Sequence, residues 1–179
     1  DFNLPKDLIA QHPTQNREDA RLLVVDRGRN QIHHSHFRDI VDWLRRDDCL
    51  VLNETKVIPA KLIGYRTKTK GRWQGLYLES DPHSGVIKVM CKTRGNIQPG
   101  ETVTLQDRDG LDRLLITMVA KLEGGCWAIK PTEETSVEEF LKQVGRIPLP
   151  HYIRDGNMCD SDVEDYQTVY ARREGAVAA

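Results

Sequence analysis

The sequence predicts an α/β fold: a mixed-sheet α/β domain, incomplete in this chain, with a small antiparallel β-barrel domain inserted into it. The middle of the chain is a series of short apolar runs separated by turn residues, which is typical of a small barrel or sandwich. The sequence on both sides of this series has the mixed patterns of an α/β domain. We therefore expect the α/β domain at residues 1–64 and 149–179, continuing beyond Ala179, and the barrel at residues 65–148.

The first part of the chain alternates between helix-like and strand-like patterns. A short helix is expected at Leu4–Ala10, because Pro5 suits the first turn of a helix. Arg21–Asp26 has the pattern of a strand, Arg27–Asn30 that of a turn, and Gln31–His34 is a candidate partner strand.

A longer helix is expected over His36–Arg46, with Ser35 as its N-cap. The apolar residues of this segment have helical spacing: Phe37, Ile40, Val41 and Leu44.

The most informative stretch is DCLVLNETKVIPAKLIG, at residues 48–64. Its first apolar run, Cys49–Leu52, predicts a buried strand, and a second run, Val57–Ile63, is interrupted by Pro59. Between the two runs lie an amide, a carboxylate, a hydroxyl and an ammonium group: Asn53, Glu54, Thr55 and Lys56. Such groups at the end of a buried strand favour a ligand-facing edge. An ordinary solvated strand end is the alternative.

Five strands are expected in the barrel region, separated by turns that contain glycine or proline. They are Trp73–Leu78, Val86–Cys91, Thr102–Leu105, Leu114–Lys121 and Cys126–Ile129. Pro99 and Gly100 suit the two central positions of a type II turn.

A helix is expected after the barrel strands, because Ser136-Val137-Glu138-Glu139 has the pattern of a capping box and Gly145 can end the helix. Its apolar face is Val137, Phe140, Leu141 and Val144. The acidic segment Met158–Asp165 is expected to be a loop, and Val163–Ala171 fits either a strand or a helix.

Composition limits the classes of function. The hydrophobic content of 39% and the charged content of 30% are those of an ordinary soluble protein. The net charge of −1 excludes attraction of nucleic acid by the whole surface, so any RNA site must be a local patch. No apolar run reaches the ~20 residues of a membrane span. The four cysteines lack metal or disulfide spacing, which favours reduced thiols in a cytoplasmic protein.

A metal site is not expected. His33, His34 and His36 form a tight group, but zinc needs further ligands in tetrahedral geometry, and the cysteines are not spaced to supply them.

A basic run with aromatic residues at both ends follows the second apolar run: Tyr65, Arg66, Lys68, Lys70, Arg72 and Trp73. Cations bind phosphates and aromatic rings stack on unpaired bases, so the run predicts an RNA contact that Lys92 and Arg94 can extend. A solvated edge strand kept soluble by its charges is the alternative.

Two further polar clusters are candidate binding residues. Arg17 and Arg21 flank a charged segment before the first strand, and a solvated loop is their alternative interpretation. Near the end of the chain, phenol, amide and hydroxyl groups that can hold a base or a ribose stand in a row, with an internal hydrogen-bond network as the alternative: Tyr166, Gln167, Thr168 and Tyr170.

Four blocks carry a family resemblance. They are LIAQHPTQNREDARLLVVD, VLNETKVIPAKL, GRIPLPHYI and DYQTVYARREGAVAA, in this order. In these blocks and in their order, the chain resembles the N-terminal half of S-adenosylmethionine:tRNA ribosyltransferase-isomerases, enzymes of queuosine biosynthesis. The chain starts without an initiator Met and stops within a family motif, so we expect it to be part of a longer protein. It departs from the family pattern at Glu54, where Asp is usual, and at Lys56 and Lys61, where Arg is usual.

The resemblance implies a transferase that uses S-adenosylmethionine as a ribosyl donor and needs no metal. The acceptor would be 7-aminomethyl-7-deazaguanine at the wobble position of tRNA, and the products epoxyqueuosine-tRNA, adenine and methionine. We expect a cytoplasmic monomer in which Glu54 and Lys56 are catalytic. The expected substrate contacts are Asn53, Thr55, Arg17, Arg21, Tyr166, Gln167, Thr168 and Tyr170, and the expected tRNA contacts are Arg66, Lys68, Lys70, Arg72 and Trp73. An RNA-binding module or an inactive paralogue is the alternative.

Overall fold

The computed structural model describes residues 2–177, and the chain divides into two compact units. The smaller unit runs to Leu52 and includes residues 150–157; the larger one contains residues 53–149 and 158–179. The division of the chain predicted from the sequence, at residues 64 and 148, stays a prediction. No helix among residues 2–177 combines the length and the apolar composition of a transmembrane segment.

The smaller unit is built around a β-hairpin. Strands β1 (Arg21–Asp26) and β2 (Gln31–His36) pair antiparallel, with Arg21 opposite His36 and Asp26 opposite Gln31. The turn between them is stabilised by the Asp26 carboxylate, which accepts a hydrogen bond from the Arg29 backbone N–H at 3.0 Å. The predicted strand, turn and partner strand are confirmed.

The helices of this unit are short 3₁₀ helices: η1 (Lys6–Leu8), η2 (Arg17–Asp19), η3 (Phe37–Trp43) and η5 (Arg154–Gly156). The α-helix predicted at His36–Arg46 is therefore wrong in type. Ser35 does not cap it, because its hydroxyl donates to the Asp39 carboxylate at 2.6 Å, and the same carboxylate accepts the His36 backbone N–H at 3.0 Å.

The buried strand predicted at Cys49–Leu52 is also wrong. These residues form no strand, and Val51 is 86% exposed. Strand β3 instead begins within the polar stretch and covers Thr55–Val57. Apolar composition predicted burial, but burial also requires a partner surface, and none covers this segment in the described part of the chain.

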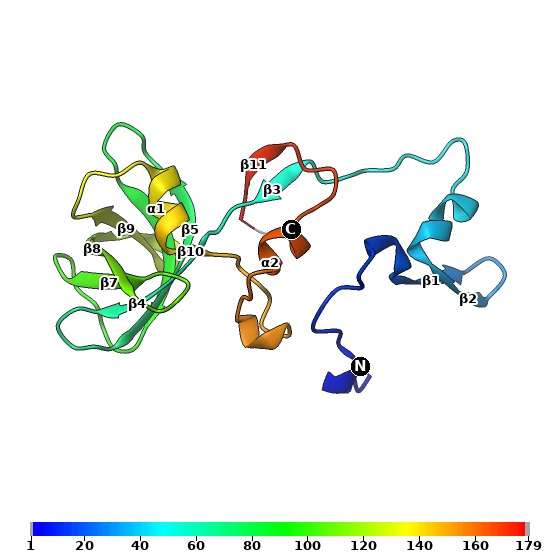
Figure 1. Cartoon of the computed structure of the whole chain (residues 1–179), viewed down its shortest axis with the longest axis horizontal. Helices are drawn as coiled ribbons and strands as arrows, with labels where there is room; N and C mark the ends of the chain where they lie inside the picture. The colour runs from blue at the N-terminus through cyan, green and yellow to red at the C-terminus, as the bar shows by residue number, and fades with distance from the viewer. Residues whose placement is uncertain (1, 178–179) are drawn as a thin grey trace. The chain divides into compact units, whose positions relative to one another are not determined.

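The larger unit contains a closed six-stranded antiparallel barrel (Figure 1). Its strands follow the order β4-β5-β6-β9-β8-β7, and a second pairing between β4 and β7 closes the ring. The bounds are β4 Lys61–Arg66, β5 Arg72–Ser80, β6 Ile87–Thr93, β7 Thr102–Gln106, β8 Asp112–Lys121 and β9 Cys126–Pro131. The five strands predicted between residues 73 and 129 are confirmed. The predicted turn at Pro99-Gly100 is confirmed too, with φ of +85° at Gly100 and a 3.2 Å bond from the Glu101 N–H to the Gln98 carbonyl.

The core of the barrel is continuous with one α-helix. Alternate residues of the strands point inward, among them Leu62, Trp73 and Met118, and all three are fully buried. Helix α1 (Val137–Val144) adds Phe140, Leu141 and Val144 to the same core, as its predicted apolar face requires.

Helix α1 begins and ends where its sequence signals predict. The Ser136 hydroxyl accepts the Glu139 backbone N–H at 3.2 Å, and Gly145 ends the helix. Gly145 then enters strand β10 (Gly145–Arg146), which pairs antiparallel with the start of β4.

The last two elements of the described chain are a helix and a strand that pairs parallel with β3. Helix α2 (Asp162–Asp165) replaces part of the predicted acidic loop, and strand β11 (Arg173–Ala176) pairs parallel with β3, with Arg173 opposite Thr55 (Figure 1). Parallel and antiparallel pairing therefore coexist in the chain, and the predicted fold class, a mixed sheet with an antiparallel barrel, is confirmed.

Closure of the barrel predicts a severe effect of one small substitution. A Cβ atom at Gly64 would lie 2.2 Å from the Thr104 carbonyl oxygen, and this backbone atom cannot move without opening the β4–β7 pairing. Gly64→Ala should lower the free energy of unfolding by about 1–3 kcal/mol or more, measured by urea unfolding. Gly71→Ala is the matched control, since its Cβ would meet nothing closer than 3.4 Å. Equal stability of the two variants would contradict this account of closure.

Candidate functional site

The polar stretch predicted as a ligand-facing edge lies at the start of β3. Its backbone is held by the end of the chain, because the Glu54 carbonyl accepts the N–H groups of Arg172 at 2.8 Å and Arg173 at 3.3 Å. The Asn53 side chain accepts the Thr55 N–H at 3.0 Å, which fixes the entry into the strand. The side chains of Glu54 and Lys56 are exposed.

A cavity of about 500 Å³ lies beside β3, within the larger unit. Its apolar walls come from the segment Val57–Pro59, from Val137 and Leu141 of α1, and from Ile147 and Val163. Its polar lining consists of Lys56, Arg108, Glu138, Lys142 and Gln167. Three cations against one carboxylate, on an apolar floor, suit a ligand with an apolar body and a negatively charged group.

Gln167 holds one wall of this cavity in place. Its amide nitrogen donates to the Val57 carbonyl at 2.8 Å, and its amide oxygen accepts the Val57 N–H at 2.9 Å. The neighbouring Thr168 hydroxyl donates to the Asn53 carbonyl at 3.3 Å. The structure therefore brings the predicted clusters at residues 53–56 and 166–170 together, through contacts from side chain to backbone.

The other predicted substrate contacts are absent from the cavity lining. Asn53, Glu54 and Thr55 are next to Lys56 but are absent from the cavity lining, and Tyr170 is 54% exposed. Arg17 and Arg21 belong to the smaller unit, in η2 and at the start of β1.

Sequence reasoning missed three charged residues of the cavity. Arg108 lies in the turn between β7 and β8, whereas Glu138 and Lys142 lie one helical turn apart on α1. No local pattern distinguishes them from ordinary surface charges. The packing of α1 and of the turn between β7 and β8 beside the β3 segment brings them to one cavity.

The histidine group is engaged in local structure. The His33 ring lies 5.1 Å from the Trp43 ring, and the His36 backbone starts η3. Within residues 2–177, no three His, Cys, Asp or Glu side chains are grouped in a way that could hold a metal ion.

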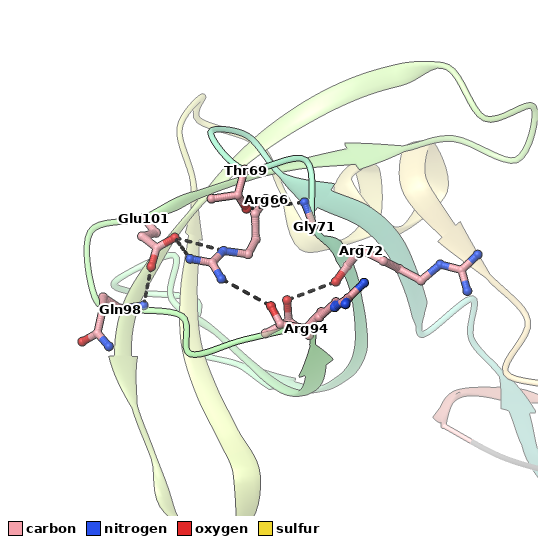
Figure 2. A network of polar contacts seen from close by, with 8 residues as sticks. Arg66, Thr69, Gly71, Arg72, Arg94, Gln98 and Glu101 are labelled. Atoms are coloured by element: carbon pink, nitrogen blue, oxygen red, sulfur yellow. Dashed lines mark hydrogen bonds and ion pairs between the residues drawn. The ribbon is translucent and has the colours of Figure 1, made fainter.

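Figure 2 shows that Arg66 of the basic run is engaged in an ion pair. Its guanidinium donates to the Glu101 carboxylate at 2.6 and 3.1 Å, and the Arg66 and Glu101 side chains are only 12% and 27% exposed. The same carboxylate accepts the Gln98 N–H at 2.7 Å. The hydrogen bonds from Arg66 are the main cause of a lowered pKa of Glu101. The ion pair engages the Arg66 guanidinium within the protein, and the predicted tRNA contact of Arg66 stays a prediction.

Trp73 was predicted to stack on RNA, which requires an exposed ring, and its position in the structure is different. Side chains alternate across a strand, so Arg72 points to solvent while Trp73 points into the barrel and is 0% exposed. A fully buried indole cannot stack on an RNA base, and the predicted contact from Trp73 is wrong.

The remaining cations of the run are exposed, and Arg94 joins them from the end of β6. The Arg94 N–H donates to the Arg72 carbonyl at 3.5 Å, and Arg66 donates to the Arg94 carbonyl at 3.4 Å (Figure 2). The Lys70 ammonium lies 4.5 Å from the centre of the Tyr65 ring. We call this group the barrel-end cations: Lys68, Lys70, Arg72 and Arg94.

The whole sequence, residues 1–179, matches the profile of the family described as queuosine biosynthesis protein. The chain belongs to this family. It is 42% identical over 180 aligned residues to a family relative, the S-adenosylmethionine:tRNA ribosyltransferase-isomerase of Syntrophotalea carbinolica. The match covers 100% of this chain and 50% of that protein, so the chain spans about half the length of this curated relative.

A solved structure is also similar to this family member. It is the S-adenosylmethionine tRNA ribosyltransferase of Thermotoga maritima, at 34% identity and a TM-score of 0.30. The match covers 73% of this chain and 43% of that one.

The pair of Arg66 with Glu101 predicts a pH-dependent stability. A carboxyl group whose pKa is lowered by folding contributes stability that is present above its unfolded pKa of ~4.3 and lost as the pH falls below it. Glu101→Gln should therefore be less stable than the wild type at about pH 7, and the difference should shrink toward about pH 3. Urea unfolding at both pH values measures it. Glu133→Gln, in an exposed loop, is the control, and a difference independent of pH would contradict the assignment.

Proposed function

We propose that the protein transfers and isomerises the ribosyl moiety of S-adenosylmethionine onto 7-aminomethyl-7-deazaguanine at the tRNA wobble position. The products are epoxyqueuosine-tRNA, adenine and methionine. The observation that carries the proposal is 42% identity along the whole chain to a relative named for this activity. The chain spans about half the length of that relative.

The cavity beside β3 is our candidate for this chain's part of the small-molecule site. S-adenosylmethionine supplies the ribosyl group and carries a carboxylate, a sulfonium and an adenine. Lys56, Arg108 and Lys142 fit the carboxylate, because cations in a partly apolar site bind it by charge-assisted hydrogen bonds. The apolar walls around Leu141 and Ile147 fit the uncharged parts of the molecule.

Glu54 and Lys56 are our candidates for action on the same ligand. Glu54 immediately precedes β3 and stands two residues from Lys56, and residues two apart in an extended chain share one face. We assign Lys56 to binding and to charge stabilisation, and Glu54 to proton transfer at the reacting group. The Gln167 amide, which is bonded to Val57, positions β3. The remaining proposed substrate contacts are Asn53, Thr55, Arg17, Arg21, Tyr166, Thr168 and Tyr170.

The activity is tested with the protein at its natural length. It should release adenine from S-adenosylmethionine only when tRNA carrying the aminomethyl-deazaguanine base is present, measured by chromatography of the products. RNA binding without adenine release would overturn the proposed reaction and would support an RNA-binding module or an inactive paralogue.

Removal of the Lys56 charge tests the role of the cavity. A hydrogen bond to a charged group contributes about 1.5–3 kcal/mol, so Lys56→Gln should lower kcat/KM for S-adenosylmethionine by about tenfold or more. Lys130→Gln makes the same change at the exposed position of β9 and should leave kcat/KM unaltered. Equal activity of both variants would remove Lys56 from the site.

A further inference from the structure

We propose that the barrel-end cations bind the sugar–phosphate backbone of RNA, and that Arg66 and Glu101 position this surface without contacting the RNA. This inference rests on the proposed function, because tRNA is the substrate of the proposed reaction. It concerns a surface formed within the barrel alone, separate from the cavity beside β3.

Two turns of the barrel form this surface. The turn at residues 67–71, between β4 and β5, carries Lys68 and Lys70, and Arg72 begins β5. Arg94 follows β6, in the loop that leads to β7. A groove of about 470 Å³ lies between the turn after β4 and the start of β7, with Arg66, Lys68, Thr69 and Gly100–Thr102 in its walls, so Lys68 is the barrel-end cation that lines it. Its volume gives room for a sugar–phosphate unit.

The turns are joined by the network of Figure 2. Arg66 bonds to Glu101 on one side and to the Arg94 carbonyl on the other, so one guanidinium links the turn after β4 to both ends of the loop between β6 and β7. The Thr93 hydroxyl adds a bond to the Arg72 carbonyl at 3.0 Å. Cations on turns held in this way bind an anion with little loss of conformational freedom.

The surface formed by the barrel-end cations has a net positive charge after the Arg66–Glu101 ion pair is included. Glu101 is the carboxylate of the groove, and Arg66 neutralises it. No ion pair joins the barrel-end cations to a carboxylate among residues 2–177. Since the chain has a net charge of −1, attraction of phosphates requires a local excess of positive charge such as this one.

Lys70 differs from a lysine that serves only solubility. Its backbone adopts the left-handed conformation, with φ of +57°, which L-residues other than Asn and Asp rarely do. Its ammonium lies over the Tyr65 ring, and the Tyr65 hydroxyl is in turn fixed by a bond to Asp112. A charge held in a defined place matches a role in recognition better than a role in general hydration.

The test measures tRNA affinity of the natural-length protein as a function of salt, from about 50 to 200 mM, without S-adenosylmethionine. The slope of log K against log salt is negative, and by the slope we mean its magnitude, which falls by about one for each lost phosphate contact. Lys68→Gln with Arg72→Gln should therefore lower the slope by about two and weaken binding to every tRNA sequence alike. These side chains are exposed, so the fold should be unaffected.

A matched pair of substitutions is available at the other end of the strands. Lys88 and Lys130 lie beside the turn between β5 and β6, and Lys88→Gln with Lys130→Gln removes the same charge. This control should leave the slope unchanged. An equal fall in both double variants, or no fall in either, would overturn the proposal.

The positioning role needs a variant that conserves net charge. Arg66→Gln with Glu101→Gln removes the ion pair without altering the charge, so it should lower affinity several-fold and leave the slope unchanged. A slope lower by about one would show that Arg66 itself contacts phosphate and would overturn its assignment. Adenine release is measured in parallel. An inactive protein whose slope responds as expected would refute the proposed reaction and support this site, whereas an active protein whose slope never responds would do the reverse.

Discussion

The pairing of β4 with both β5 and β7 is the constraint on which the larger unit depends. Without the β4–β7 pairing, six strands would form an open sheet with two exposed edges. Closure places Leu62, Val103 and Leu105 around one core, and it brings the turn after β4 next to the loop before β7. The Arg66–Glu101 pair joins these two segments, so the groove at this end of the barrel exists only because the ring is closed.

Most of the barrel could be predicted from the sequence because its signals are local. Alternating side chains, turn glycines and the Ser136 cap act within a few residues, and the structure agrees with them. The failures have a different origin. Cys49–Leu52 is as apolar as a buried strand, yet burial depends on a partner surface that the segment itself does not encode.

The site was only partly predictable for the same reason. Lys56 and Gln167 were found from their neighbours in the sequence, and both line the cavity. Arg108 and Lys142 reach the cavity through the packing of distant elements, so no spacing rule identifies them. In the basic run, Arg66 and Arg72 look alike in sequence, but the distant Glu101 neutralises Arg66 and leaves Arg72 exposed.

The Gln167 amide has a consequence for the behaviour of β3 toward other molecules. A short strand with free N–H and C=O groups can recruit a strand from a second chain and start aggregation. Gln167 occupies both groups of Val57 with a side chain, which pairs like a neighbouring strand but cannot be extended by another one. The Gln167 side chain therefore occupies the two backbone groups of Val57 through which a further strand would pair with β3 at this residue.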